Sequence, residues 1–189
     1  TLLIIPLMAA QVSMNKEAEF ASSVELVAAL ARTGKFKIRV GAYPEAHPDA
    51  ADRFADVTWL KRKIDAGASS AITQFFFEAD TFFRFRDACV KAGITAPIIP
   101  GILPIQSWEG TKKFAARCGA SIPYRLDEGF AAAKRDGREE LLALTQCTSL
   151  CDRLIQGGVQ DLHFLLHARR AGRARRALRN GAAATSSRR

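Results

Sequence analysis

Short apolar segments alternate with longer amphipathic segments along most of the chain, and this alternation restricts the fold more than any other feature. The short segments are rich in β-branched and aromatic residues, which predicts strands. They are Phe36–Tyr43, Ser70–Phe77, Ala96–Leu103 and Val159–Leu166. Most of them are almost continuously apolar, as is typical of parallel strands that are covered on both faces or closed into a barrel. The run "LLIIPL" near the N-terminus is a candidate fifth strand.

The segments between these strands have the helical period, and several of them end at a glycine. We expect helices at Ser22–Thr33, Ala55–Asp65, Ala79–Lys91, Lys112–Arg117, Asp127–Arg135 and Arg138–Ile155. Gly34, Gly67 and Gly93 follow the first three helices, where a residue with left-handed backbone often ends a helix. Alternation of strand and helix predicts an α/β fold with parallel pairing. A closed (β/α)₈ barrel usually needs about 250 residues. The expected fold class is therefore the TIM-barrel family, with this chain of 189 residues covering roughly the second half of the barrel.

The net charge of +9 is a property of the C-terminal segment. Of the 28 lysines and arginines, eight arginines lie after residue 168, which leaves 20 basic residues against all 19 acidic residues in the rest of the chain. Residues 167–189 are also poor in large apolar side chains, so we expect a disordered basic tail. A nucleic-acid-binding protein that uses this tail is one alternative function. The nearly neutral remainder of the chain disfavours it.

The cysteines, histidines and N-terminal residues exclude several other classes. The 4 cysteines include no CxxC pair and there are only 3 histidines, which predicts no metal site and no disulfide scaffold. The opening "TLLIIPLMAA" is too short to span a bilayer and lacks the basic residues that precede a signal-peptide core. We therefore expect a cytoplasmic protein with reduced thiols and no membrane partner.

Residues at the carboxyl ends of barrel strands build the site in this fold class. The candidates are Tyr43 with the following loop "PEAHP", Thr73 with Gln74, the segment "PGILP", and His163 with Phe164. A flavin-free barrel lyase or aldolase is a second alternative function. It is disfavoured because no lysine stands at the end of a predicted strand to form a Schiff base.

Several long motifs occur in order: "AYPEAHP", "LKRKIDAGASSAITQFFF", "RFRDAC", "PIIPGILPI" and "KKFA". Together they resemble the flavin-dependent methylenetetrahydrofolate reductases of bacterial type over Phe20–Phe164. The resemblance implies a TIM barrel that holds FAD non-covalently. NADH or NADPH reduces the flavin, and the flavin then reduces 5,10-methylenetetrahydrofolate to 5-methyltetrahydrofolate, in one-carbon metabolism and methionine biosynthesis. It divides the chain into an unmatched segment 1–19, a partial barrel domain 20–166 and the tail 167–189.

The resemblance also assigns binding residues. For FAD these are Gly41, Tyr43, His47, Asp56, Arg62, Lys63, Ser22 and Ser23, although the two serines stand where the family more often has Tyr-Ala. Cationic side chains on the helix that follows the first loop suit a diphosphate, and a carboxylate suits ribose hydroxyls. For the substrate side they are Gln74, Phe114 and Arg169. An amide can donate to and accept from the edge of a heterocycle, the aromatic ring can pack on it, and a guanidinium fork suits the folate carboxylates.

These residue types have ordinary structural roles as well. A loop histidine is usually solvated, a strand glutamine can bond to backbone, a helix phenylalanine is usually core, and charges on one helix face can be neighbours in solvent.

Two parts of the family pattern have no counterpart in the sequence. They are the strand that carries the acid thought to protonate the folate and the Arg-Gly-Asp segment beside the flavin, so no catalytic residue is assigned in this chain. Trp59 also replaces a polar residue near the cofactor, and Gly110 replaces a glutamine on the substrate side. Half a barrel would leave open strand edges. We therefore expect a truncated copy that binds FAD weakly and turns over negligibly, and the resemblance leaves homo-oligomerisation open.

Overall fold

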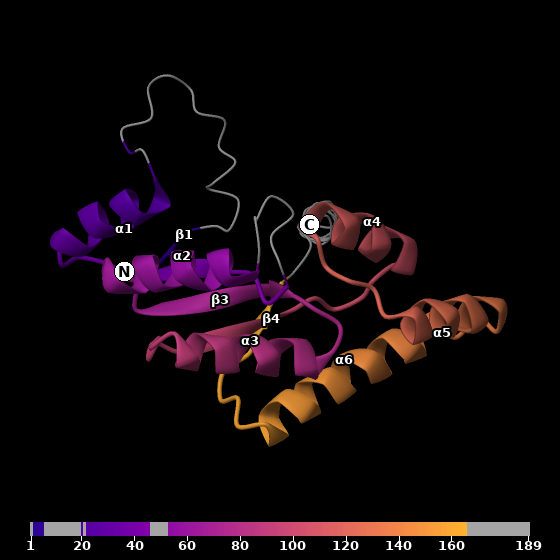
Figure 1. The fold of residues 1–189 in the computed structure, drawn as a ribbon. Coiled ribbons are helices and arrows are strands. Elements are labelled where there is room, and N and C mark those ends of the chain that lie inside the picture. Colours follow the sequence, from indigo (N-terminus) through magenta and orange to yellow (C-terminus); the bar gives the residue numbers. More distant parts are fainter. Residues whose placement is uncertain (1, 6–19, 21, 46–52, 166–189) are drawn as a thin grey trace, which may run out of the picture.

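The structure is a computed structural model that describes residues 2–5, 20, 22–45 and 53–165, and Figure 1 shows its elements in chain order. The tail 167–189 and the residues His47 and Arg169 lie outside the described residues. The strands are β1 (Leu2–Ile5), β2 (Lys37–Ala42), β3 (Ser70–Phe75), β4 (Ile98–Ile102) and β5 (His163–Phe164). The helices are α1 (Ser23–Arg32), α2 (Arg53–Asp65), α3 (Ala79–Lys91), α4 (Trp108–Cys118), α5 (Tyr124–Arg135) and α6 (Glu139–Gln156).

All the strands belong to one sheet with the order β1-β2-β3-β4-β5, and each neighbouring pair is parallel. The spatial order therefore repeats the order in the chain, with at least one helix in every connection between β2 and β5. This is the arrangement of an arc of a (β/α)₈ barrel. The expected α/β class with parallel pairing is confirmed, and so is the candidate strand in "LLIIPL", which pairs with β2 through Leu2 and Lys37.

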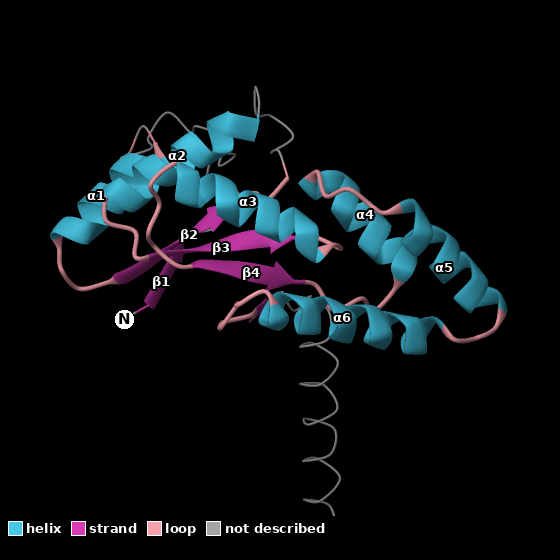
Figure 2. Ribbon diagram, turned by 60° about the horizontal axis from the view of Figure 1, so that its bottom comes forward, coloured by secondary structure: helices cyan, strands magenta, loops and turns pink. Residues whose placement is uncertain are grey.

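Helices cover one face of the sheet and extend beyond its carboxyl end. Figure 2 shows α1, α2 and α3 over the sheet, with the arrowheads of β3 and β4 pointing toward α4 and α5. One core cluster joins β2 and β3 to α1, α2 and α3, and it includes Val27, Ile38, Val40, Leu60 and Phe85. A second, rich in aromatic rings, lies at the carboxyl ends of β3 and β4 under α4 and α5. A third packs α3 against α6.

Glycines end the first three helices as the sequence predicts. Gly34, Gly67 and Gly93 have φ values of 65°, 114° and 74°, a region in which side chains other than glycine are strained. Gly67 is required by space as well, because a Cβ at this position would lie 2.5 Å from the Cβ of Ala31. The close approach of α1 to the end of α2 therefore depends on this glycine.

Three expected boundaries are wrong, each because of a local hydrogen bond or proline. α4 begins at Trp108 rather than Lys112, since the hydroxyl of Ser107 accepts from the backbone N–H of Gly110 and caps the helix there. α5 begins at Tyr124, directly after Pro123. The expected strand Val159–Leu166 shrinks to β5, because the N–H of Val159 donates to Leu154 O and completes the end of α6.

Candidate functional site at the carboxyl end of the sheet

The pairing of β3 with β4 is irregular at the position where the sequence predicts a substrate-binding glutamine. The register shifts between Ile72 and Phe75. Inside the irregularity, the Oγ1 of Thr73 accepts from the N–H of Gly101 at 2.9 Å. A Cβ on Gly101 would lie 2.2 Å from the carbonyl oxygen of Thr73, so the two backbones touch. Bulges of this kind redirect a side chain at the rim of a barrel.

Gln74 lies half-buried within this irregularity. Its Oε1 accepts from the backbone N–H of Phe75 at 3.1 Å. The amide NH₂ of Gln74 has no hydrogen-bond partner among the described residues. The side chain is thus fixed through its oxygen, and its two N–H donors are available to a ligand.

An aromatic cluster follows Gln74 directly. Phe75 stacks on Phe114 of α4, with ring centroids 5.1 Å apart and an interplanar angle of 21°. The guanidinium carbon of Arg117 lies 5.7 Å from the centre of the Phe114 ring. Phe114 therefore packs on Phe75, the chain neighbour of Gln74 in β3 and a residue to which the sequence assigns no role.

The cluster continues into α5, where a polar network fixes its far end. Trp108 stacks on Phe130 at 4.3 Å and 9°. Its Nε1–H donates to Asp127 at 2.7 Å, and the Lys112 ammonium lies 3.3 Å from the same carboxylate. Together the Trp108 N–H and the Lys112 ammonium hold the pKa of Asp127 below its usual range. This network anchors α4, and with it Phe114, to α5.

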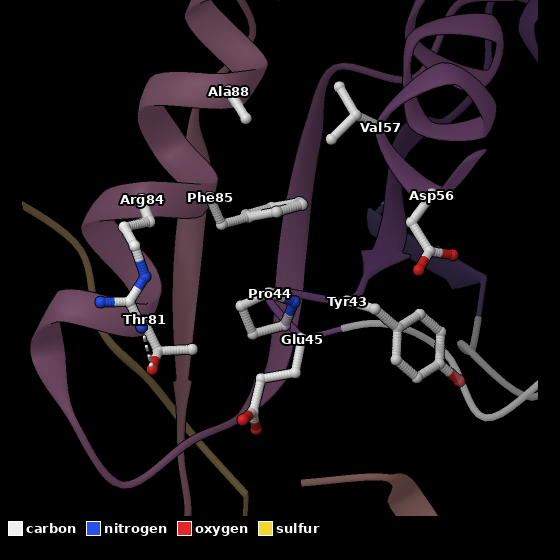
Figure 3. A pocket seen from close by; sticks show the side chains of 9 residues that line it. All are labelled: Tyr43, Pro44, Glu45, Asp56, Val57, Thr81, Arg84, Phe85 and Ala88. Atoms are coloured by element: carbon white, nitrogen blue, oxygen red, sulfur yellow. Dashed lines mark hydrogen bonds between the residues drawn. The ribbon is translucent and has the colours of Figure 1, made fainter. Parts of the chain in front are cut away.

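A second feature of this end is a cavity of about 110 Å³ between α2 and α3, at the carboxyl end of β2. Figure 3 shows side chains of the two helices facing one another across Tyr43, Pro44 and Glu45. Tyr43 and Asp56 both line this cavity, and their shared binding of FAD stays a prediction. The opposite wall holds Arg84, whose Nη2 donates to the hydroxyl of Thr81 at 3.3 Å. No sequence feature assigns Arg84 or Thr81 to a site, although Arg84 opens the motif "RFRDAC".

The loop after β2 is tied to the segment that joins α4 to α5. The carboxylate of Glu45 accepts from the backbone N–H of Ser121 at 3.0 Å, across 76 residues of sequence. The cavity beside Tyr43 and the aromatic cluster around Phe114 thus belong to one connected rim.

The expected cationic residues lie on α2. Burial lowers the pKa of Lys63, and the nearby charge of Asp56 opposes this shift. The guanidinium carbon of Arg62 lies 5.0 Å from the centre of the exposed Trp59 ring. Trp59, noted as a departure from the family pattern, therefore holds Arg62 by a cation–π contact.

The remaining predicted residues have simple placements. Ser22 is the N-cap of α1, and its hydroxyl accepts from the N–H of Glu25 at 3.3 Å; Ser23 is the first residue of the helix. Gly41 lies in β2 opposite Ile72 of β3. Because His47 lies outside the described residues, its expected meeting with Gln74 at the rim stays a prediction.

The donor set suits a dinucleotide better than a metal. Arg84 and Asp56 line the cavity, and Arg62 and Lys63 lie in the last turn of α2. Cations and a carboxylate are a combination that fits phosphates and ribose hydroxyls. Within the part of the chain that the structure describes, no group of three or more His, Cys, Asp or Glu side chains could hold a metal ion. The helices described there include none that is long and apolar enough to cross a bilayer.

Comparison with known proteins decides the family. The family model for methylenetetrahydrofolate reductase matches residues 6–172. The chain belongs to the methylenetetrahydrofolate reductase family. A 5,10-methylenetetrahydrofolate reductase of Salmonella typhimurium is 43% identical over 143 residues, which cover 75% of this chain and 48% of that protein. The Escherichia coli K12 enzyme of the same name is 43% identical over 141 residues, covering 74% and 48%.

The match to the reductase family is partial in length. The chain spans about half the length of the relatives it matches. A solved structure of a Clostridium thermocellum protein, described as binding two copies of 5-methyl-5,6,7,8-tetrahydrofolic acid, aligns with a TM-score of 0.47 and 18% identity over 68% of this chain and 46% of that one. A likeness of that size is too low to support a fold or a ligand.

Proposed function

We propose that this chain forms the second half of a flavin-dependent methylenetetrahydrofolate reductase barrel, which binds FAD and, with NADH or NADPH, reduces 5,10-methylenetetrahydrofolate to 5-methyltetrahydrofolate. The observation that carries the proposal is the carboxyl end of β3, where Gln74 has amide N–H donors without a partner among the described residues and the next residue, Phe75, stacks on Phe114. Family membership supports the same reaction.

FAD supplies the hydride-transfer chemistry when it is bound. The chain's own residues would hold and orient the ligands. Arg62, Lys63 and Arg84 would neutralise phosphate charge, and Asp56 would accept from a ribose hydroxyl. The lowered pKa of Lys63 reflects burial without a strong ion pair, so a phosphate would remove an electrostatic cost that the unliganded residue bears.

On the substrate side, the amide of Gln74 would donate to a carbonyl of the nicotinamide or of the pterin. The ring of Phe114 would contact the flat face of the same group, with Phe75 fixing the ring from behind. Holding both groups at one place would let the reductant and the folate use the site in turn. No residue of this chain is proposed as the proton donor, and the roles of His47 and Arg169 remain as the resemblance implies.

The first experiment measures FAD binding by quenching of flavin fluorescence. We expect saturable but weak binding by the isolated chain, in line with the small cavity. Lys63→Met should raise the Kd about tenfold through loss of one partly buried cation, a change of about 1.4 kcal/mol. Lys91→Met, which removes an exposed lysine in the last turn of α3, should leave the Kd unchanged. Absence of saturable FAD binding would contradict the proposal.

The second experiment adds the part of the family's length that this chain does not match. The complementary half is defined as the part of the Escherichia coli relative that this chain does not match. A fusion of the complementary half to this chain should oxidise NADH or NADPH with methylenetetrahydrofolate as acceptor. Gln74→Ala should lower kcat/KM by 10-fold or more, about 1.4 kcal/mol. Gln156→Ala, at the exposed end of α6, is the matched control.

A further inference from the structure

Two polar side chains on the inner face of the sheet have buried atoms without hydrogen-bond partners. The inner face is defined as the face opposite the core that β2 and β3 share with α1, α2 and α3. Ile38, Val40 and Ala71 point into that core. Because side chains alternate along a strand, Arg39 and Ser70 lie on the inner face.

Arg39 and Ser70 are also direct neighbours. They are paired in the register of β2 with β3. The Nε of Arg39 and the Oγ of Ser70 are both buried and make no hydrogen bond, and Ser70 is only 4% exposed. Arg39 is half-buried and has no ion pair with any described residue. Buried donors are nearly always satisfied in folded proteins, so this pair indicates a missing acceptor.

The described acids do not supply this acceptor. Asp161 precedes β5, and β5 lies three strand positions from β2. At about 4.8 Å per strand this is ~14 Å across the sheet. The exposed Lys37 stands on the same face and strand as Arg39, so the local charge of the inner face is positive. A carboxylate is the complementary group, since it can accept from the guanidinium and from the serine hydroxyl together.

We propose that the inner face docks the complementary half of the reductase barrel, and that the complementary half places a carboxylate against Arg39 and Ser70. The chain's relatives are about twice as long as the matched region, so the family contains the polypeptide that would cover this face. The proposal holds whether that half is joined to this chain or is a separate polypeptide. It rests on the proposed function, because it takes the occupant to be the rest of the same reductase.

The test is whether Arg39→Met changes the stability of the isolated chain and of the fusion in opposite directions. In the isolated chain, Arg39→Met removes a half-buried guanidinium whose buried Nε has no partner, and it keeps the apolar stem, so the urea midpoint should rise. In the fusion with the complementary half, the same change leaves a buried carboxylate unpaired. The ratio of folded to unfolded protein should then fall about 100-fold or more. Lys37→Met is the matched control, because it removes an exposed cation from the same strand and face, and it should change neither protein appreciably.

The carboxylate itself can then be identified. Each Asp and Glu of the complementary half is changed to its amide in the fusion, with and without Arg39→Met. One position should show a large loss that disappears in the Arg39→Met background, as a double-mutant cycle requires for a direct pair. If the fusion does not fold, the two halves are refolded together and the complex is measured by sedimentation.

Three results would overturn the proposal: no folded product in either format, an Arg39→Met change that stabilises or leaves unchanged the completed barrel, or one that destabilises the isolated chain. The last result would mean that Arg39 already has a partner within this chain. FAD binding and reductase activity of the fusion test the proposed function separately. A fusion in which Arg39→Met shows the opposite stability effects but which binds no FAD would support the docking surface and contradict the proposed function.

Discussion

Replacing Gly101 by alanine tests whether the contact between β3 and β4 fixes the candidate substrate site. The added Cβ would lie 2.2 Å from the carbonyl oxygen of Thr73 and 3.3 Å from its carbonyl carbon. Ordinary contacts need about 3.4 Å or more, and the obstructing atoms are backbone, which no rotamer change can move. The two strands must therefore separate.

The expected loss of stability in Gly101→Ala has two contributions. Overpacking of a tight interior typically costs about 1–3 kcal/mol. Separation of the strands also weakens the hydrogen bond from Gly101 N–H to Thr73 Oγ1, worth about 1 kcal/mol. We expect Gly101→Ala to lower the free energy of unfolding by about 2–4 kcal/mol, as measured by urea denaturation followed by circular dichroism.

Gly110→Ala is the matched control. A Cβ at Gly110 would lie 3.6 Å from the Oγ of Ser107, which is ordinary contact. Gly110 is in the first turn of α4, so alanine should be neutral or stabilise the protein by up to about 1 kcal/mol. A Gly101→Ala protein within about 1 kcal/mol of the unmodified chain would refute the argument that the two backbones touch at this point.

Three further predictions use neighbouring or titrating groups. Ser69→Ala should lower the free energy of unfolding by about 1 kcal/mol, because the Ser69 hydroxyl donates to Ile38 O at 2.9 Å. Ser70→Ala removes a buried hydroxyl without a partner and should be neutral or stabilising. Equal losses of stability in urea denaturation would contradict this pair of predictions. Trp108 and Lys112 lower the pKa of Asp127 in the folded protein. The Asp127 carboxylate therefore stabilises the fold at pH values above its unfolded-state pKa, and this stabilisation is lost as the pH falls through its folded-state pKa. The stability difference between the unmodified chain and Asp127→Asn should therefore shrink on acidification, and a difference that grows would be evidence against the Trp108 contact. Burial raises the pKa of Cys89 to about 11. The neutral thiol therefore contributes its full stabilisation of the fold below the unfolded-state pKa of about 9, and this stabilisation is lost as the pH rises toward 11. Mass spectrometry should find Cys89 unlabelled by iodoacetamide at neutral pH until urea unfolds the chain, and prompt labelling would show that it is accessible.

The sequence predicts which segments meet at the carboxyl end of the sheet, because they stand at strand ends and the strand order follows the chain, whereas their roles in binding stay predictions. Tyr43 and Asp56 were predicted together, and they line one cavity. Phe114 stacks on Phe75, the chain neighbour of Gln74, and the assignment of Gln74 and Phe114 to one ligand stays a prediction. Arg84 and Thr81 were missed because they lie on a helix, and only packing of α3 beside α2 places them at the end of β2.

The sequence by itself determined the local elements and their parallel order. Apolar periodicity and helix-ending glycines depend on neighbours within a few residues, and a glycine such as Gly67 after a helical segment predicts the positive φ that the structure shows. Only the tertiary structure decided the register shift at Gln74, the wall formed by Arg84, and the unpaired Arg39 beside Ser70. Each of these depends on which atoms of distant segments meet, since a hydrogen bond or a steric contact between strands is set by packing and not by the order of residues along the chain.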